Sequence, residues 1–142
     1  MAAADHRIYA SMAQIAKGPF EVKLLPAPLS DVAAPTGLSR MSLDKSWSGD
    51  LSGRSQGEML AYRSSVQGSA GYVAMERVHG SLLGKQGSFV LQHSSTMTRG
   101  APLQSITVVP DSGTGDLLGL DGSMIIEVQA GKHSYVFTFT LP

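Results

Sequence analysis

The sequence predicts an all-β protein, an eight-stranded antiparallel up-and-down β-barrel of the allene oxide cyclase-like or lipocalin-like shape. From Gly18 onward, Ser and Thr alternate with bulky residues in short runs, which is typical of strands. Turn-forming Gly and Pro separate the runs, and 16 glycines in 142 residues exceed the usual share of about 7%. No long helical pattern interrupts them, so the chain contains little besides strands and turns.

About eight strands lie between the turns. We expect them at residues 20–25, 38–48, 54–63, 69–79, 88–98, 103–109, 123–129 and 133–141. Short links between consecutive strands favour antiparallel hairpins. Closing the sheet removes its two free edges, and an eight-stranded barrel holds side chains or one small ligand. A two-sheet sandwich is the alternative, but sandwiches usually use longer cross-connections.

The first residues differ from the rest. Residues 1–17 are Ala-rich and contain no Gly, and Ile8, Met12 and Ile15 recur at near-helical spacing. We therefore expect an N-terminal extension over residues 1–17, either flexible or a short helix. Residues 18–142 are expected to form a single barrel domain.

Charge and cysteine content exclude several classes of protein. The 11 basic and 11 acidic residues give a net charge of zero, which argues against a nucleic-acid partner. Without cysteine there is no disulfide, thiolate zinc site or cysteine nucleophile. No stretch approaches the roughly 20 apolar residues of a membrane span, and no secretory leader is evident. We expect a cytoplasmic protein without a membrane partner.

The last strand has two distinct faces. His133, Tyr135, Phe137 and Phe139 share one face, and Ser and Thr dominate the other. Alternation alone does not say which face is inside, because subunit contacts can bury an outer wall. The scarcity of charge on the strands predicts a homo-oligomer, a dimer or larger.

Four residues are the candidates for catalysis: Glu58, Tyr72, Glu76 and His93. They come from three successive strands, at positions where the neighbours on the same face are apolar or small. In a regular meander their faces all point inward, unless a bulge changes the register. Structural pairing of these polar residues is the alternative to a ligand site.

The chemistry expected of this group is proton transfer. Burial disfavours the charged form of a carboxyl group, so the pKa of a cavity carboxyl rises, and two nearby carboxyls move further apart in pKa. One of Glu58 and Glu76 is then a base and the other a proton donor. His93 shuttles the proton, because imidazole titrates near neutral pH, and Tyr72 bonds a substrate oxygen.

Four further residues are candidates for substrate binding: Lys45, Trp47, Glu127 and Tyr135. Lys45 interrupts an apolar stripe beside Trp47, so it is either a buried charge partner or a lysine that reaches the rim. Glu127 either joins the cavity or faces solvent. Tyr135 belongs either to the cavity or to the packed wall.

No cofactor or metal site is expected. The four histidines have no paired metal-ligand spacing, and neither a phosphate-binding loop nor a dinucleotide fingerprint is present. Asp111 and Asp116 lie in a Gly-rich loop whose spacing fits turns better than a calcium loop.

Several motifs together resemble a known family. They are Arg40-Met-Ser-Leu-Asp-Lys45, Gly57-Glu-Met59, Gly68-Ser-Ala-Gly-Tyr-Val-Ala-Met-Glu-Arg77, Gly87-Ser-Phe-Val-Leu-Gln-His93, Met97-Thr-Arg-Gly100 and Val109-Pro-Asp-Ser-Gly-Thr-Gly115. From about Gly18 to Pro142 the chain is similar to the bacterial "domain of unknown function 3224" family. That family resembles allene oxide cyclase in fold, a barrel with a cavity. The resemblance implies cofactor-free isomerisation or cyclisation of a hydrophobic molecule.

Three functions remain open at this stage. The first is a cofactor-independent isomerase, cyclase or lyase that acts on a hydrophobic small molecule by general acid–base catalysis. The second is a barrel that carries a hydrophobic ligand without chemistry, and the third is a structural homo-oligomer filled by its own side chains. An interior cavity separates the third from the other two.

Overall fold

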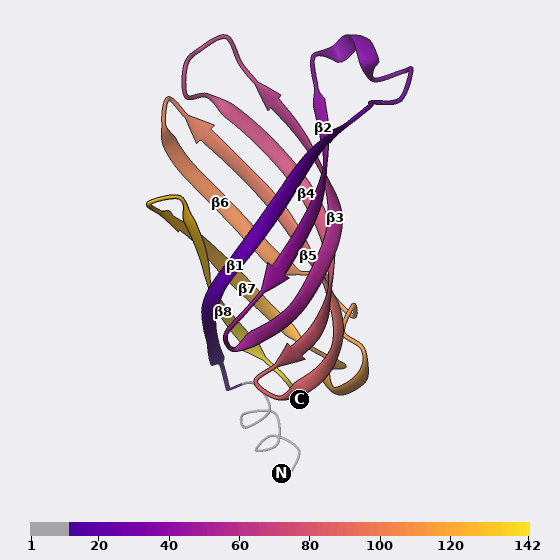
Figure 1. The fold of residues 1–142 in the computed structure, drawn as a ribbon, viewed down its shortest axis with the longest axis vertical. Helices are drawn as coiled ribbons and strands as arrows, with labels where there is room; N and C mark the ends of the chain where they lie inside the picture. The colour runs from indigo at the N-terminus through magenta and orange to yellow at the C-terminus, as the bar shows by residue number, and fades with distance from the viewer. Residues whose placement is uncertain (1–11) are drawn as a thin grey trace, which may run out of the picture.

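The structure, a computed structural model, describes residues 12–142 as one closed antiparallel barrel of eight strands (Figure 1). In chain order the elements are β1 (Gln14–Ala27), η1 (Ala34–Thr36), β2 (Ser39–Trp47), β3 (Leu51–Arg63), β4 (Ala70–Leu82), β5 (Lys85–Thr98), β6 (Ala101–Val108), η2 (Gly115–Leu117), β7 (Asp121–Gln129) and β8 (Lys132–Thr140). Each strand pairs with the next, and β1 closes the barrel against β8. The predicted up-and-down barrel is confirmed, and this closure excludes the sandwich.

The first strand begins earlier than the domain boundary expected at residue 18. Residues 14–17 pair with β8, from Gln14 opposite Phe139 to Lys17 opposite Val136. Ala16 is fully buried, whereas Ile15 is exposed, which is the alternation of a strand and not of a helix. The near-helical spacing of Met12 and Ile15 does not produce a helix at residues 14–17, because these residues pair with β8 to close the barrel. The rest of the expected extension, residues 1–11, lies outside the described residues.

Buried side chains fill the end of the barrel where β1 begins and β8 ends, the lower end in Figure 1. Every second residue of β8 points inward, and Tyr135, Phe137 and Phe139 are at most 2% exposed. Phe137 stacks on Phe89 at 5.8 Å and on Phe139 at 5.3 Å between ring centroids. Leu117 of η2 is fully buried in the same apolar cluster. These contacts form a solid plug that closes this end.

The opposite end carries the β1–β2, β3–β4, β5–β6 and β7–β8 connections and is open. The β1–β2 connection is the longest of these and contains η1, none of whose residues is buried. The barrel is therefore closed by packed side chains at the end where β1 begins and β8 ends, and open at the opposite end.

One seam of the barrel is only lightly joined. The pairing of β6 with β7 comprises Thr107 opposite Ser123, whereas β3 and β4 pair continuously from Leu51–Leu82 to Arg63–Ala70. Nearer the open end, the Ile126 amide donates to Gln104 Oε1 at 2.9 Å, so a side chain replaces the missing backbone partner. The β6–β7 seam is therefore the most sparsely paired seam of the barrel.

No helix among residues 12–142 is long and apolar enough to cross a membrane.

Candidate functional site

Four polar side chains point into the barrel just above the apolar plug. Lys45 comes from β2, Ser55 from β3, Glu76 from β4 and His93 from β5, and each is at most 5% exposed. Buried ionisable groups are rare unless they are paired, so their shared position indicates one network.

Glu76 is the centre of this polar network. Its Oε2 accepts hydrogen bonds from Lys45 Nζ at 2.8 Å and from His93 Nε2 at 2.6 Å. Its Oε1 accepts from Ser55 Oγ at 2.6 Å, and Ser55 Oγ in turn accepts from Trp47 Nε1 at 3.0 Å. Both carboxylate oxygens are thus satisfied, as a buried charge requires.

Strand register explains how these residues meet. Lys45 lies opposite Ser55, and Glu76 lies opposite Gly57, which is the next inward position on β3. A Cβ on Gly57 would overlap the backbone of β4 and come within 2.7 Å of the Glu76 Cα. Glycine therefore permits the close approach of β3 and β4 beside the carboxylate.

The electrostatics of Glu76 differ from the sequence expectation. Burial by itself would raise the pKa of Glu76, as expected for a carboxyl in a cavity. The hydrogen bond from His93 and the positive charge of Lys45 outweigh burial and lower the pKa from 4.5 to about 2. The expectation of a raised pKa is therefore wrong for this carboxyl, because its partners supply more stabilisation than desolvation removes.

Lys45 lies between two aromatic rings. Its Nζ is 5.1 Å from the centroid of Phe20 and 5.2 Å from that of Trp47, within the range of cation–π attraction. Within the described part of the chain, its one hydrogen bond goes to Glu76. An ammonium group carries three N–H donors, so donors remain for a ligand.

A cavity of about 340 Å³ lies against the polar network inside the barrel. Its lining is mostly apolar, with five residues that carry polar groups among Phe20, Val22, Leu24, Leu43, Lys45, Met59, Tyr72, Ala74, His93, Gln104, Ile126, Val128 and His133. A second hollow of about 500 Å³ lies at the open end and shares Leu24, Met59, Tyr72 and Gln104 with it. The two hollows are therefore neighbours along the barrel interior, between the mouth and Lys45 and His93.

A larger hollow, about 700 Å³, lies elsewhere. It runs between the β1–β2 connection and the outer wall, where it is lined mostly by outward-facing residues such as Leu60, Val73 and Met75. His93 also borders this hollow, but Lys45, Ser55 and Glu76 do not. The interior cavity, where apolar walls meet a few convergent polar groups, is the better candidate site.

Comparison with known proteins assigns the family. The profile of the family described as "Protein of unknown function (DUF3224)" matches residues 16–139. The chain belongs to the DUF3224 family. A crystal structure at 1.84 Å resolution of a DUF3224 protein with unknown function from Shewanella oneidensis MR-1 is 47% identical, with a TM-score of 0.87. That match covers 92% of this chain and 98% of the other. No curated protein matches the sequence.

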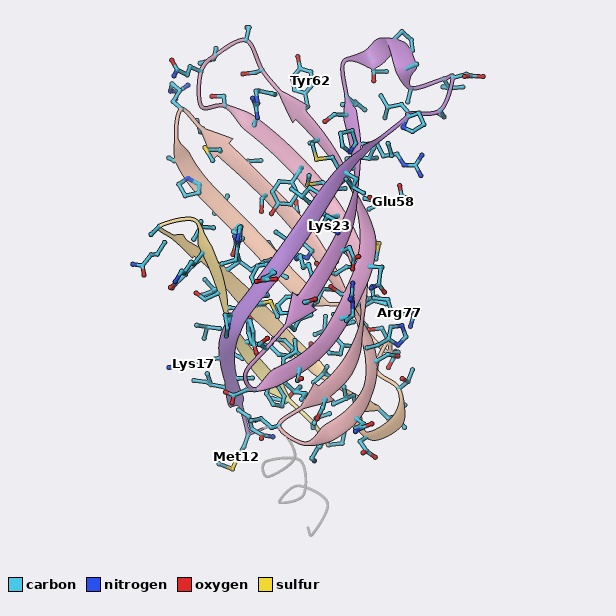
Figure 2. The ribbon with its side chains drawn as sticks, in the orientation of Figure 1. Met12, Lys17, Lys23, Glu58, Tyr62 and Arg77 are labelled. Atoms are coloured by element: carbon cyan, nitrogen blue, oxygen red, sulfur yellow. The ribbon has the colours of Figure 1, made fainter. Side chains whose placement is uncertain are left out.

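In this DUF3224 barrel, three of the four expected catalytic residues face inward. Glu76 and His93 are in direct contact, and Tyr72 lines both the inner cavity and the mouth. Glu58 lies on the outer wall, where its carboxylate forms an ion pair with Arg40 (Figure 2). The hydrogen bond from Arg40 lowers the pKa of Glu58, and Arg40 also donates to the Pro28 carbonyl at 2.9 Å. Glu58 therefore fastens the β1–β2 connection to the wall.

The parity of β3 explains why Glu58 is apart from the others. No bulge shifts the pairing of β3 with β4, and the odd-numbered residues of β3, including Leu51 and Ser55, face inward. Glu58 thus shares the outer face with Leu60 and Tyr62, as the sequence indicated, but this face is not the cavity face. A two-residue alternation by itself does not say which of the two faces is inside.

The four expected substrate-binding residues also lie in different places, and only Lys45 lines the cavity. Trp47 is not part of the lining; its ring lies 5.2 Å from Lys45 Nζ and is edge-on to Tyr135 at 5.2 Å. The Tyr135 hydroxyl accepts from the Leu51 amide and donates to the Ser48 carbonyl, and burial raises the pKa of Tyr135. Tyr135 therefore belongs to the plug below the cavity. Glu127 is exposed on the outside of β7.

Sequence reasoning missed several residues of the DUF3224 cavity. Ser55 holds one oxygen of Glu76, and Phe20 and His133 contribute rings that pack at 5.2 Å from each other. The Ser95 hydroxyl is buried at the mouth without a hydrogen-bond partner in residues 12–142. A possible signal was the in-phase alternation of Leu51, Gly53, Ser55 and Gly57, which are apolar or small and therefore typical of an inner face.

No group of three or more side chains suited to a metal ion gathers among residues 12–142.

Proposed function

We propose that this protein is a cofactor-independent isomerase, cyclase or lyase that moves protons on a hydrophobic small molecule inside the barrel. The observation that carries the proposal is the buried network of Lys45, Glu76 and His93, which adjoins a cavity of about 340 Å³. The resemblance of the family to allene oxide cyclase, itself a barrel with a cavity, agrees with this chemistry but supports it through fold alone.

The lowered pKa of Glu76 defines the roles within the network. A carboxyl with a pKa of about 2 stays ionised near neutral pH, so Glu76 positions other groups and does not exchange protons. We assign His93 the neutral tautomer with its hydrogen on Nε2, which donates to Glu76, so that Nδ1 presents a lone pair. Nδ1 makes no side-chain hydrogen bond within residues 12–142 and is the proposed base. The carboxylate then stabilises the imidazolium that forms.

Lys45 and Tyr72 complete the proposed site. The ammonium of Lys45 stabilises negative charge that develops on a substrate oxygen, in a site where apolar walls strengthen electrostatic interactions. Tyr72, which lines both hollows, orients the substrate through its hydroxyl. Proton transfer by a positioned residue typically contributes about 10²–10⁴-fold to the rate.

A non-catalytic carrier is the second candidate. The mouth is lined largely by apolar side chains, among them Leu24, Met41, Met59, Met97 and Leu103, and such a lining suffices to hold a hydrophobic ligand. A carrier of apolar molecules, however, has no need of a buried lysine and histidine. The carrier therefore explains the mouth but leaves the floor of the cavity unexplained.

The test is a comparison of turnover by two variants. The protein is incubated with a hydrophobic metabolite extract, and the products are followed by liquid chromatography and mass spectrometry. We expect the wild type to convert at least one compound, and His93→Gln to lose about 10²-fold or more of that rate. His79→Gln is the matched control, because His79 is exposed on the outside of β4.

Two outcomes contradict the enzyme. Equal conversion by His93→Gln and the wild type would show that the imidazole does no chemistry. Extraction of a compound from the mixture without conversion would favour the carrier. Circular dichroism of each variant shows that the barrel is intact.

The outer wall supports the proposal of a homo-oligomer. Large apolar side chains are exposed there on several strands, including Leu60, Val73, Met75 and Ile125. Native mass spectrometry of the purified protein counts the subunits and any molecule that co-purifies, and a monomer would contradict the proposal.

A further inference from the structure

The charges at the floor of the cavity restrict what can bind there. Lys45 is the one residue with a permanent charge in the lining of the inner cavity, and the Glu76 carboxylate already neutralises it at 2.8 Å. His93 contacts the same carboxylate, and in the neutral tautomer proposed for the base it adds no charge. The floor is therefore electrically neutral but rich in hydrogen-bond donors.

Three classes of ligand head fit this floor poorly. A carboxylate or phosphate would add an uncompensated negative charge in an apolar enclosure, beside Glu76, and burial of such a charge is costly. A cation would meet the ammonium of Lys45 and no free acceptor of opposite charge. A hydrocarbon would exclude water from the remaining ammonium donors without replacing its hydrogen bonds.

A ligand with a neutral acceptor oxygen fits the floor. The proposed base, His93, favours one kind of neutral oxygen compound over the others. Lys45 and His93 are neighbours in the cavity lining, because Nζ and Nε2 both contact Oε2 of Glu76, and a ligand whose oxygen is bonded to Nζ can extend its carbon atoms along the lining toward Nδ1. A carbonyl group, unlike an ether or an alcohol, acidifies the C–H bonds on its neighbouring carbon. A carbonyl compound therefore uses both groups at once.

We infer that the cavity binds a neutral, elongated carbonyl compound, a ketone, aldehyde or enone, with its oxygen on Lys45 and its acidic C–H at His93. This inference rests on the proposed function and names its substrate class. The apolar remainder of the molecule runs past Met59 and Tyr72, which line both hollows, toward the mouth. The hollows, about 340 and 500 Å³, lie in the usual range of small-molecule sites.

The step is an enolisation that balances without a co-reactant. His93 Nδ1 takes a proton from the carbon beside the carbonyl, and the electron pair of that C–H bond forms a carbon–carbon double bond. The carbonyl π electrons move to the oxygen, which becomes an enolate held by Lys45 Nζ. The imidazolium then returns the proton to the same carbon or, in a β,γ-unsaturated carbonyl compound, to the γ carbon, which moves the double bond into conjugation and gives an isomer.

The experiment uses three probes of matched length: methyl nonyl ketone, undecanoic acid and undecane. Binding is followed through the emission of Trp47, which is the single tryptophan of the chain and whose ring lies 5.2 Å from Lys45 Nζ in the cavity lining. We expect the ketone to bind at least about tenfold more tightly than the acid or the alkane, as one hydrogen bond to a charged group implies. Lys45→Met should abolish this preference, whereas Lys23→Met, on the outside of β1, should keep it.

The second measurement follows the proton itself. In D₂O, the wild type should incorporate deuterium into the ketone at the carbons beside the carbonyl, as mass spectrometry of the recovered ketone reports. His93→Gln should reduce this exchange by about 10²-fold or more with little change in ketone affinity, and His79→Gln should not. If Lys45→Met does not fold, the infrared carbonyl stretch of the bound ketone in the wild type replaces it, and a shift to lower frequency supports the contact.

The outcomes separate the two proposals. Binding of the acid or the alkane as tightly as the ketone overturns the carbonyl inference, whatever the exchange shows. Selective ketone binding without deuterium exchange supports the carbonyl inference and contradicts the enzymatic function, which leaves a carrier of carbonyl compounds. Selective binding with exchange that depends on His93 supports both.

Discussion

The substitution Lys45→Met tests the electrostatics of the buried network most directly. It removes the ammonium group and keeps much of the side-chain length, so the Phe20 and Trp47 rings retain an apolar neighbour. Glu76 is left as a carboxylate that is 1% exposed and bonded to His93 and Ser55 alone. We expect a marked loss of stability near neutral pH.

The magnitude follows from the pKa of Glu76. A pKa of about 2 in the folded protein, against 4.5 for the ordinary group, corresponds to about 3 kcal/mol of stability at neutral pH. Removal of one partner from a buried ion pair typically costs about 3–5 kcal/mol. We therefore expect Lys45→Met to lower the free energy of unfolding at pH 7 by about 3–5 kcal/mol.

The pH dependence gives the sign of the effect. In the wild type the folded pKa of Glu76 is depressed, so its stabilisation is present above pH 4.5 and is lost as the pH falls toward 2. In Lys45→Met, burial is opposed by fewer partners, so the pKa of Glu76 rises. The variant should therefore lose less stability on acidification, and the difference between the two proteins should shrink.

Urea unfolding at several pH values between 7 and about 3, followed by the emission of Trp47, measures both free energies. Lys23→Met controls for the loss of a lysine from the outer wall. Lys45→Met combined with Glu76→Gln should recover part of the lost stability, because no uncompensated charge remains. A loss of stability that stays constant over this pH range would refute the assigned coupling between Lys45 and Glu76.

Three further substitutions test the packing around the site. Gly57→Ala should lower the free energy of unfolding in urea by about 1–3 kcal/mol, because the added Cβ overlaps the backbone of β4. Gly71→Ala is the control, because a Cβ has room at that position, and it should cause no such loss. Equal losses in the two variants would contradict the close approach of β3 and β4 at Gly57. Tyr135→Phe should cost about 1–3 kcal/mol by thermal or urea unfolding, since it leaves a buried amide of β3 without its acceptor, and an unchanged midpoint would contradict that role. Gln104→Leu should speed amide hydrogen exchange at Ile126, and unaltered exchange would show that the β6–β7 seam does not depend on this side chain.

Much of the fold was predictable from the sequence because strand alternation and turn residues are local signals. The runs between the Gly- and Pro-rich turns became β1 to β8, and the short links became antiparallel neighbours. The start of β1 was not predictable in the same way. Residues 14–17 acquire their strand conformation from β8, more than a hundred positions away, and a local pattern carries no information about that partner.

The candidate site, like the fold, was predictable in part from local sequence patterns and in part only from the tertiary structure. The sequence by itself identified Glu76, His93, Tyr72 and Lys45 as polar residues on otherwise apolar or small faces. Only the tertiary structure decided that Glu58 faces outward, because a two-residue period defines two faces without saying which one is enclosed. The tertiary structure also decided the direction in which the pKa of Glu76 shifts. That direction depends on Lys45 and His93, which are 31 and 17 positions away in the chain and meet Glu76 only when the barrel closes.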